Sequence, residues 1–227
     1  MVPLRRHQLV WITADAWRRV LAAMSRAGDA HVLGCVRYWA AHDLPLVVTR
    51  QAPGFSGVRA GVPVALGIAA PLRWDRRRIA VVVGGSDLRR SGLFPRAEAI
   101  GPLLTAPVRA AWQATCAALE RAGIDARVYG SYGWAIVTGL PYRHAHSDID
   151  LVLAVAGPLQ ADAAIAQMQA AGAATPRLDG ELVFPDGAAI AWREWAAWRA
   201  GKVGRMLIRR LDGVGLECML AAAEVTP

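Results

Sequence analysis

The sequence predicts a protein of the α/β (α+β) class, and two patterns carry this prediction. In the C-terminal half, segments with the alternation of a strand are interleaved with segments that have the spacing of an amphipathic helix. In the N-terminal half, short apolar runs are separated by Pro and Gly residues, which is typical of strands joined by turns. We therefore expect a small β-rich module over residues 1–95, a linker over 96–107, and a mixed sheet with helices over 108–227.

The N-terminal half is predicted to begin with a strand or turn over residues 5–12. Thr13 is a typical helix-capping residue, and it predicts a helix over residues 16–26. Residues 96–107 show no clear periodicity, which is why we expect a linker there. Between the helix and the linker, three apolar runs bounded by Pro and Gly are expected to be strands, over residues 44–50, 62–69 and 76–85.

The C-terminal half is predicted to begin with an amphipathic helix over residues 108–122, which Gly123 ends. A short strand, a tight Gly130-Ser131 turn and one or two helical turns follow; after a loop come a second strand and a second helix. A Pro-Asp-Gly sequence then joins two strands in a hairpin. The expected ranges are 126–129, 132–138, 148–155 and 159–171, with 181–184 and 188–192 for the hairpin.

The composition excludes several classes of protein. Of the 227 residues, 55% are apolar and only 19% are charged, which is typical of a folded chain and not of a disordered one. No apolar stretch approaches the roughly 20 residues that a bilayer-spanning helix needs, and charged residues interrupt the N-terminus before a signal-peptide core forms. We therefore expect a cytoplasmic protein without a membrane partner. The three cysteines are far apart, so neither a disulfide framework nor a zinc site is indicated.

Positive charge is concentrated in the first half of the chain. The protein holds 26 Lys and Arg residues against 18 Asp and Glu, a net charge of +8. Residues 1–107 hold 15 Arg and 6 acidic residues, a net charge of +9, and the remaining residues carry a net −1. Such a basic region suggests an anionic partner, and nucleotide phosphates, a nucleic acid and an acidic protein all fit that description.

Two aspartates and a Gly-Ser turn form the most specific pattern in the sequence. Asp148 and Asp150 stand two residues apart at the start of an apolar strand, and side chains with this spacing lie on one face. Two neighbouring carboxylates repel each other unless a cation lies between them, and Mg²⁺ prefers such oxygen ligands. Gly130 allows close approach to the backbone, and Gly130 and Ser131 open the following helix. Because a helix N-terminus binds phosphate, we expect both a metal ion and a phosphate here.

This combination resembles the nucleotidyltransferase superfamily, the fold of DNA polymerase β and the aminoglycoside nucleotidyltransferases. In that superfamily the Gly-Ser turn holds the β- and γ-phosphates, and the Asp-x-Asp pair holds metal ions. A narrower family, the phosphoribosyl-dephospho-CoA transferases that serve as holo-acyl-carrier-protein synthases of malonate decarboxylase, is similar in the strings RRHQLVWI, GSYGWAIVTGLPYRHAHSDIDLVL and LDGELVFPDGAAIAWREW. The 16 residues between Ser131 and Asp148 are a long spacing for the superfamily, and this departure favours the narrower family.

The resemblance implies a nucleotidyltransferase-like mixed sheet in the C-terminal half and a group-transfer reaction. A triphosphoribosyl-dephospho-CoA donor would give its phosphoribosyl-dephospho-CoA unit to a serine of the apo acyl-carrier subunit of malonate decarboxylase, and diphosphate would leave. By the same resemblance, Gly130 and Ser131 bind the donor, and Asp148 and Asp150 act in catalysis by holding Mg²⁺. In-line displacement at phosphorus requires such metal assistance.

Two further groups of side chains are candidates for this site. Members of the superfamily use a third carboxylate from a neighbouring strand, and we expect Glu181 in that role, with Asp179 and Glu194 as alternatives. His144 and His146 lie close to the aspartates in sequence and could bind metal or guide a proton. We favour local hydrogen bonds for these two histidines.

Arginines are expected to bind the phosphates of the donor. The candidates are Arg76, Arg77, Arg143 and Arg209, with Arg73 and Arg78 as further possibilities. The run Arg76–Arg78 could instead face the acidic carrier protein or be a solvated strand end. Trp192, Trp195 and Trp198 recur at every third residue, which is the spacing of one helical face, and we expect them in the core.

Two alternative functions remain open from the sequence. The first is an ATP-using nucleotidyltransferase that modifies a small molecule or acts as an antitoxin-type enzyme, because it would keep the same aspartates. The second is a nucleic-acid-binding module built on the basic half, which would bind DNA or RNA in a salt-sensitive manner. No known motif for reading nucleic acid supports this second alternative, and we do not expect a nucleic-acid partner.

Overall fold

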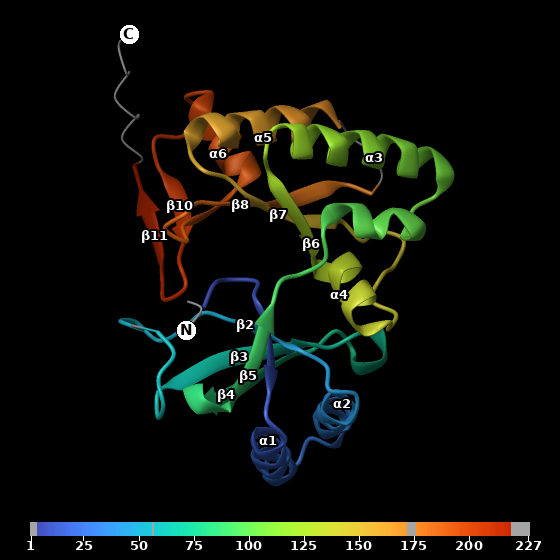
Figure 1. Cartoon of the computed structure of the whole chain (residues 1–227), viewed down its shortest axis with the longest axis vertical. Helices are drawn as coiled ribbons and strands as arrows, with labels where there is room; N and C mark the ends of the chain where they lie inside the picture. Colours follow the sequence, from blue (N-terminus) through green and yellow to red (C-terminus); the bar gives the residue numbers. More distant parts are fainter. Residues whose placement is uncertain (1–3, 56, 172–175, 219–227) are drawn as a thin grey trace. The chain divides into compact units, whose positions relative to one another are not determined.

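The computed structural model describes residues 4–55, 57–171 and 176–218, and the chain divides into two compact units (Figure 1). The first unit consists mainly of the N-terminal part, and the second unit mainly of the C-terminal part. The first comprises Met1–Phe94, Trp134–Arg143 and Leu211–Gly213, and the second Pro95–Gly133, His144–Arg210 and Val214–Pro227. Among the described residues, no helix is long and apolar enough to cross a bilayer.

The first unit contains an antiparallel five-stranded sheet with two helices on one face (Figure 1). The strand order is β4-β3-β2-β1-β5. The strands are β1 (Leu9–Ile12), β2 (Leu46–Val48), β3 (Pro63–Ala69), β4 (Arg78–Gly84) and β5 (Leu88–Gly92). The helices are α1 (Ala14–Ala27) and α2 (Ala30–Ala41), and a 3-10 helix, η1 (Leu72–Trp74), follows β3. Trp39, Leu46 and Ile68 lie in the core of this unit.

The two helices of the first unit differ in how well the sequence predicted them. Helix α1 begins after Thr13, whose hydroxyl accepts a hydrogen bond from the Ala16 backbone amide, as expected for a cap. Helix α2 is absent from the predicted elements. It is capped by Asp29, which accepts hydrogen bonds from two backbone amides of the first turn. Its sequence contains Gly and β-branched residues that weaken helix propensity, so burial of Cys35 and Trp39 stabilises it instead.

The second unit contains a mixed six-stranded sheet of order β11-β10-β9-β8-β7-β6. Strands β7 and β8 are parallel, and the other neighbouring pairs are antiparallel. The strands are β6 (Asp125–Tyr129), β7 (Ile149–Ala154), β8 (Leu178–Val183), β9 (Ala189–Ala191), β10 (Met206–Arg209) and β11 (Val214–Glu217). Together with the first unit, this sheet confirms the predicted fold class, a mixed α/β protein.

Three helices cover one face of the second sheet, namely α3 (Ala106–Arg121), α5 (Pro158–Ala170) and α6 (Trp192–Arg199) (Figure 1). Trp192 and Trp195 are buried on α6, which confirms their predicted place in the core. Trp192 itself was expected to end the hairpin strand, and this was wrong, because β9 ends at Ala191 and Trp192 begins the helix. A shorter helix, α4 (Gly130–Thr138), follows β6 directly.

The segment expected to be a linker contains a 3-10 helix, η3 (Ala97–Leu103). Ala97 and Ile100 are fully buried, and the Trp112 indole donates a hydrogen bond of 2.9 Å to the Ala97 carbonyl. The segment therefore packs against α3 within the second unit.

Strand alternation divides the second sheet into an apolar face and a polar face. On β7, Ile149, Leu151 and Leu153 are fully buried, while the residues between them are partly exposed. The same alternation places Asp150 on the face opposite to the one that the helices cover. The sheet thus presents a row of polar side chains from several strands on the face opposite to these helices.

Candidate active site

The turn between β6 and α4 is shaped by a glycine that contacts Asp150. Gly130 has φ +57°, in the left-handed region that glycine adopts without strain. A Cβ at this position would lie 1.8 Å from Asp150 Oδ2, far closer than two atoms can approach. The Asp150 carboxylate therefore lies directly against the backbone at the first residue of α4. The structure thus brings together Gly130 and Asp150, two residues that the sequence pattern selected 20 positions apart.

The first turn of α4 presents its backbone amides beside this carboxylate. Ser131 is the second residue of the helix and is partly buried. The first four amides of a helix have no carbonyl partner within the helix, and they carry a partial positive charge. The turn can therefore bind a phosphate oxygen.

Asp148 is held by an arginine that the sequence analysis did not select. The Arg177 guanidinium donates to Asp148 Oδ2 from both Nε, at 3.1 Å, and Nη2, at 2.5 Å. Arg177 Nη2 also lies 3.7 Å from Asp179 Oδ2. The pKa of Arg177 is raised above its ordinary value, first because Asp148 accepts its hydrogen bonds and further because Asp148, Asp179 and Asp150 are negatively charged. The guanidinium thus contacts Asp148, lies close to Asp179 and is influenced by the charge of Asp150.

The parallel register of β7 and β8 decides which acids are neighbours. Asp150 lies directly opposite Asp179, and Val152 lies opposite Glu181. Paired residues of adjacent strands project to the same face about 4.8 Å apart. Asp179 Oδ1 accepts hydrogen bonds from the Gly180 amide, at 2.8 Å, and from Arg193 Nη1, at 2.7 Å. Asp179 is thus the closest acidic neighbour of Asp150 on β8.

Glu181 is buried on the same face and lies near a predicted arginine. Arg209 Nη1 lies 3.8 Å from Glu181 Oε1, and the Glu181 side chain is only 12% exposed. This Nη1 atom is buried and has no hydrogen-bond partner among the described residues. The sheet brings Arg209 to Glu181 because β10 and β8 both pair with β9.

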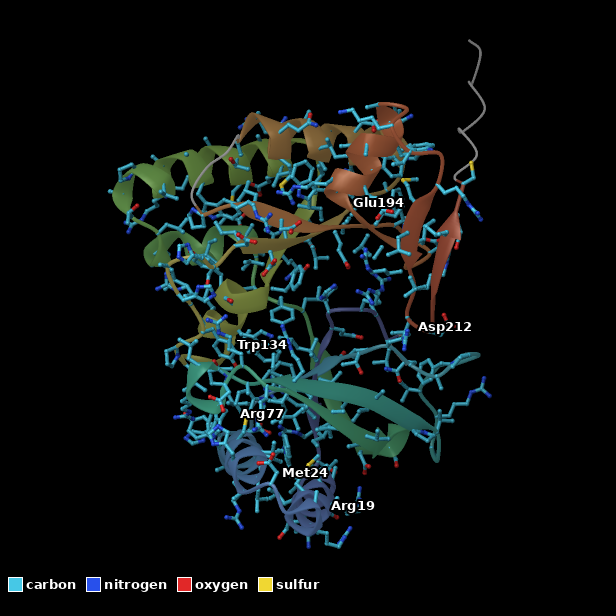
Figure 2. The ribbon with its side chains drawn as sticks, turned by 180° about the vertical axis from the view of Figure 1, so that it is seen from behind. Arg19, Met24, Arg77, Trp134, Glu194 and Asp212 are labelled. Carbon is cyan, nitrogen blue, oxygen red and sulfur yellow. The ribbon has the colours of Figure 1, made fainter. Side chains whose placement is uncertain are left out.

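Glu194 is the other alternative for the third carboxylate, but its side chain is hydrogen-bonded to a backbone amide. It lies on α6, where its Oε1 accepts a hydrogen bond of 2.5 Å from the Leu207 amide at the start of β10 (Figure 2). This contact ties α6 to β10.

The loop before β7 is held by local hydrogen bonds. The His144 amide donates to the Ser147 hydroxyl at 2.9 Å, and the His146 amide donates to His144 Nδ1 at 3.2 Å. Both histidines thus take part in local contacts of the kind favoured from the sequence. No group of three or more His, Cys, Asp or Glu side chains forms a ready metal-binding cluster in the parts of the chain that the structure describes.

The remaining predicted arginines belong to the first unit. Arg76 is exposed and has φ +53°. Arg77 forms an ion pair with Asp29, the cap of α2, and Figure 2 labels Arg77 beside these helices. Arg73 stacks over the rings of Tyr38 on α2 and Trp74 on η1, with distances of 4.0 and 3.7 Å to the ring centroids. Arg143 is exposed.

Arg177 and Arg193 are the site residues that sequence reasoning missed. Arg177 stands two positions before Asp179, the same spacing that singled out Asp148 and Asp150. That spacing predicts a shared strand face, but it gives no sign that this strand pairs with β7. The only signal in the sequence for Arg177 was therefore its position two residues before Asp179, at the start of a strand.

The chain is similar to known proteins along nearly its whole length. Residues 5–93 match the family described as phosphoribosyl-dephospho-CoA transferase MdcG N-terminal domain, and residues 95–218 match the corresponding C-terminal domain. A phosphoribosyl-dephospho-CoA transferase of Xanthomonas campestris pv. campestris is 36% identical over 93% of this chain and 92% of its own length. The enzyme of that name from Bradyrhizobium diazoefficiens is 30% identical over 94% of this chain and 90% of its length. No solved structure matched the chain significantly.

These matches identify a transferase. The chain belongs to the phosphoribosyl-dephospho-CoA transferase family, as the resemblance of its motifs indicated. The pattern of Gly130, Asp148 and Asp150 lies within the part that matches the C-terminal domain of the family.

Proposed function

We propose that this enzyme transfers the phosphoribosyl-dephospho-CoA unit of triphosphoribosyl-dephospho-CoA to a serine of the apo acyl-carrier subunit of malonate decarboxylase, with release of diphosphate, in the cytoplasm. Membership of the family supports the transfer of this CoA-derived group. The contact between the Gly130 turn and Asp150 carries the mechanistic part of the proposal. This contact places a helix N-terminus, which can bind phosphate, next to the carboxylates that would hold a metal ion. Transfer at phosphorus requires both parts.

The helix terminus is proposed to bind the donor's phosphates. The amides of Gly130 and Ser131 and the Ser131 hydroxyl are suitable donors for phosphate oxygens. Because Gly130 has no side chain, the Asp150 carboxylate lies directly against the backbone of this turn. In this arrangement a phosphate can lie at the helix terminus while Asp150 remains next to it.

The carboxylates on the polar face fit a hard divalent cation such as Mg²⁺. Asp148 and Asp179 already lie beside a cationic group, the guanidinium of Arg177, and together with Asp150 they offer the oxygen ligands that Mg²⁺ prefers. Asp148 and Asp150 would hold the ion, with Asp179 or Glu181 as the third carboxylate. The register favours Asp179, since it lies opposite Asp150. When bound, the ion supplies positive charge that stabilises the leaving diphosphate and activates the attacking hydroxyl.

Arginines are proposed to bind the remaining negative charge of the donor. Arg209 is the candidate within the second unit, where it already lies next to Glu181. In the first unit the candidates are Arg76, Arg77 and Arg143. All five aspartates of residues 4–94 pair with basic side chains of that unit, namely Asp15 with Arg18, Asp29 with Arg77, Asp43 with Arg89, Asp75 with His31 and Asp87 with Arg19.

The same residues include 14 arginines, so their net charge is strongly positive. Opposite charge on a partner speeds encounter. A phosphorylated donor and an acidic carrier subunit are therefore the partners that this unit favours.

The proposal is tested by incubating the protein with the apo carrier subunit and either triphosphoribosyl-dephospho-CoA or ATP, with Mg²⁺ present. Intact-protein mass spectrometry should show the mass of one phosphoribosyl-dephospho-CoA group added to the carrier subunit with the first donor alone. Replacing the acceptor serine with alanine should abolish the addition. Modification from ATP, with none from the CoA derivative, would overturn the proposed donor and favour an ATP-using nucleotidyltransferase.

A further inference from the structure

Arg177 and Asp148 are placed together by the backbone as well as by their side chains. Arg177 immediately precedes β8, and its carbonyl accepts a hydrogen bond of 2.9 Å from the Ile149 amide at the start of β7. The register that pairs Ile149 with Leu178 puts Arg177 beside Asp148. Both guanidinium contacts go to one atom, Asp148 Oδ2, and the same guanidinium approaches Asp179 Oδ2. Arg177 therefore connects the two strands at their polar face.

Arg177 is more exposed than the groups that it contacts. Its side chain is 61% exposed, against 31% for Asp148 and 37% for Asp179. Arg193, which binds the other oxygen of Asp179, differs from it in two ways. Its Nη2 donates to the Leu178 carbonyl at 2.7 Å, and its guanidinium lies over the Trp192 ring. Arg193 is anchored by these contacts, whereas the long, exposed side chain of Arg177 can turn into solvent.

A guanidinium and a divalent cation that contact the same carboxylate oxygen repel each other. Arginine keeps its charge at any pH that a folded protein tolerates, so the conflict is not relieved by loss of a proton. Like charges at contact distance repel each other strongly. A cation that binds Asp148 Oδ2 therefore disfavours the contact of Arg177 with that atom, and an exposed ion pair of this kind is weak enough to be displaced.

We propose that Arg177 is a positioning residue that holds Asp148 and Asp179 together while no divalent cation is bound, and that it competes with the cation for Asp148. The inference rests on the metal site of the proposed function. It adds to that site a residue that lowers the affinity for the cation when no donor is bound. Once displaced, the positive charge of Arg177 remains beside the site, where donor phosphates would be bound.

The test is a titration of the full-length chain with Mn²⁺, in which the free ion is measured by electron paramagnetic resonance with no donor present. Arg177→Gln should bind Mn²⁺ about two- to fivefold more tightly than the wild type, which is the range expected from loss of a partly exposed ion pair. Arg199→Gln is the matched control, because Arg199 pairs with Asp162 in the same unit, between α6 and α5 and away from the polar face. Its Mn²⁺ affinity should equal that of the wild type.

Two further variants separate the possible outcomes. In an Asp148→Asn background, Arg177→Gln should no longer raise the affinity, because the contested oxygen is altered. Arg177→Lys keeps the charge and should bind Mn²⁺ with an affinity closer to the wild type than Arg177→Gln does. An equal or weaker affinity in Arg177→Gln would overturn the role of Arg177, even if Asp148→Asn abolishes binding and so supports the metal site. Absence of binding by the wild type and by Arg177→Gln alike would overturn the metal site and this inference together.

Thermal unfolding gives a second readout of the same competition. Without metal, Arg177→Gln should unfold at a lower temperature than the wild type, because Asp148 loses the arginine that it pairs with. Added Mn²⁺ should raise its unfolding temperature by more than it raises that of the wild type, since tighter binding to the folded state stabilises it further. An equal or smaller rise in the variant would contradict the competition.

Discussion

In the second unit, the sheet face under α3, α5 and α6 is lined by apolar side chains, whereas the opposite face carries carboxylates and arginines. Both faces are built from the same strands. On β7, Leu151 is fully buried on the first face, and its neighbour Asp150 contacts the Gly130 turn on the second. Because successive side chains of a strand alternate, one short segment contributes both to the core and to the site. Substitutions of neighbouring residues on one strand should therefore have separate effects, one on stability and the other on the transfer reaction.

The largest effect is expected from Asp150→Asn. The change keeps the shape of the side chain but removes the charge that a cation or a developing positive charge would meet, so transfer should fall at least about a hundredfold. Far-ultraviolet circular dichroism and the unfolding temperature should stay close to those of the wild type. Asp148→Asn is expected to behave in the same way. Transfer near the wild-type rate by a folded Asp150→Asn protein would show that the polar face is not the site.

The next effect concerns the contact between the turn and the polar face. In Gly130→Ala the new Cβ would meet Asp150 Oδ2, so either the turn or the carboxylate must move. Transfer should fall by about tenfold or more, since a displacement of about 1 Å in a site costs up to a hundredfold in rate. Gly139→Ala is the matched control, because Gly139 has φ +70° and its Cβ would meet no described atom within 4 Å. Equal losses of activity in the two variants would show that Gly130 is needed only for its positive φ and not for its contact with Asp150.

On the covered face, Leu151→Ala should act on stability and not on chemistry. Removing a fully buried leucine side chain costs about 2–5 kcal/mol of unfolding free energy. Urea denaturation followed by tryptophan fluorescence measures this loss. The molecules that remain folded should transfer the group at close to the wild-type rate per folded enzyme. A large loss of kcat without a loss of stability would contradict the division between the faces.

The smallest effect is expected from the cysteines of this unit. Burial raises the pKa of the Cys116 thiol on α3 to about 12, whereas Cys218 is exposed. At pH 8 Cys116 is therefore protonated and shielded from reagents, because the thiolate is the reactive form. A maleimide should label Cys218 and leave Cys116 unlabelled until the protein is unfolded, with little change in transfer activity. Peptide mapping by mass spectrometry identifies the labelled residue. Rapid labelling of Cys116 in the folded protein would show that the helical layer opens readily.

Local patterns in the sequence predicted a large part of this architecture. Period-two alternation places Asp148 and Asp150 on one face, and the structure has Asp150 on the polar face of β7 as that pattern requires. Thr13 caps α1 as expected, and the helices and strands expected over residues 108–192 begin and end close to their expected positions, whereas β10 and β11 were not among the expected elements. Such features depend on residues a few positions apart, and therefore the sequence alone determines them.

Features that join distant segments were decided only by the tertiary structure. The parallel pairing of β7 with β8 places Arg177 beside Asp148 and Asp179 opposite Asp150, across 29 residues of chain. A shift of this register by one residue would turn the acids of β8 to the covered face, and nothing in either strand taken alone specifies the pairing. Helix α2 likewise depends on burial of Trp39, not on its own propensity. Alternation and capping are properties of a short segment, whereas register and burial arise only when the whole chain packs.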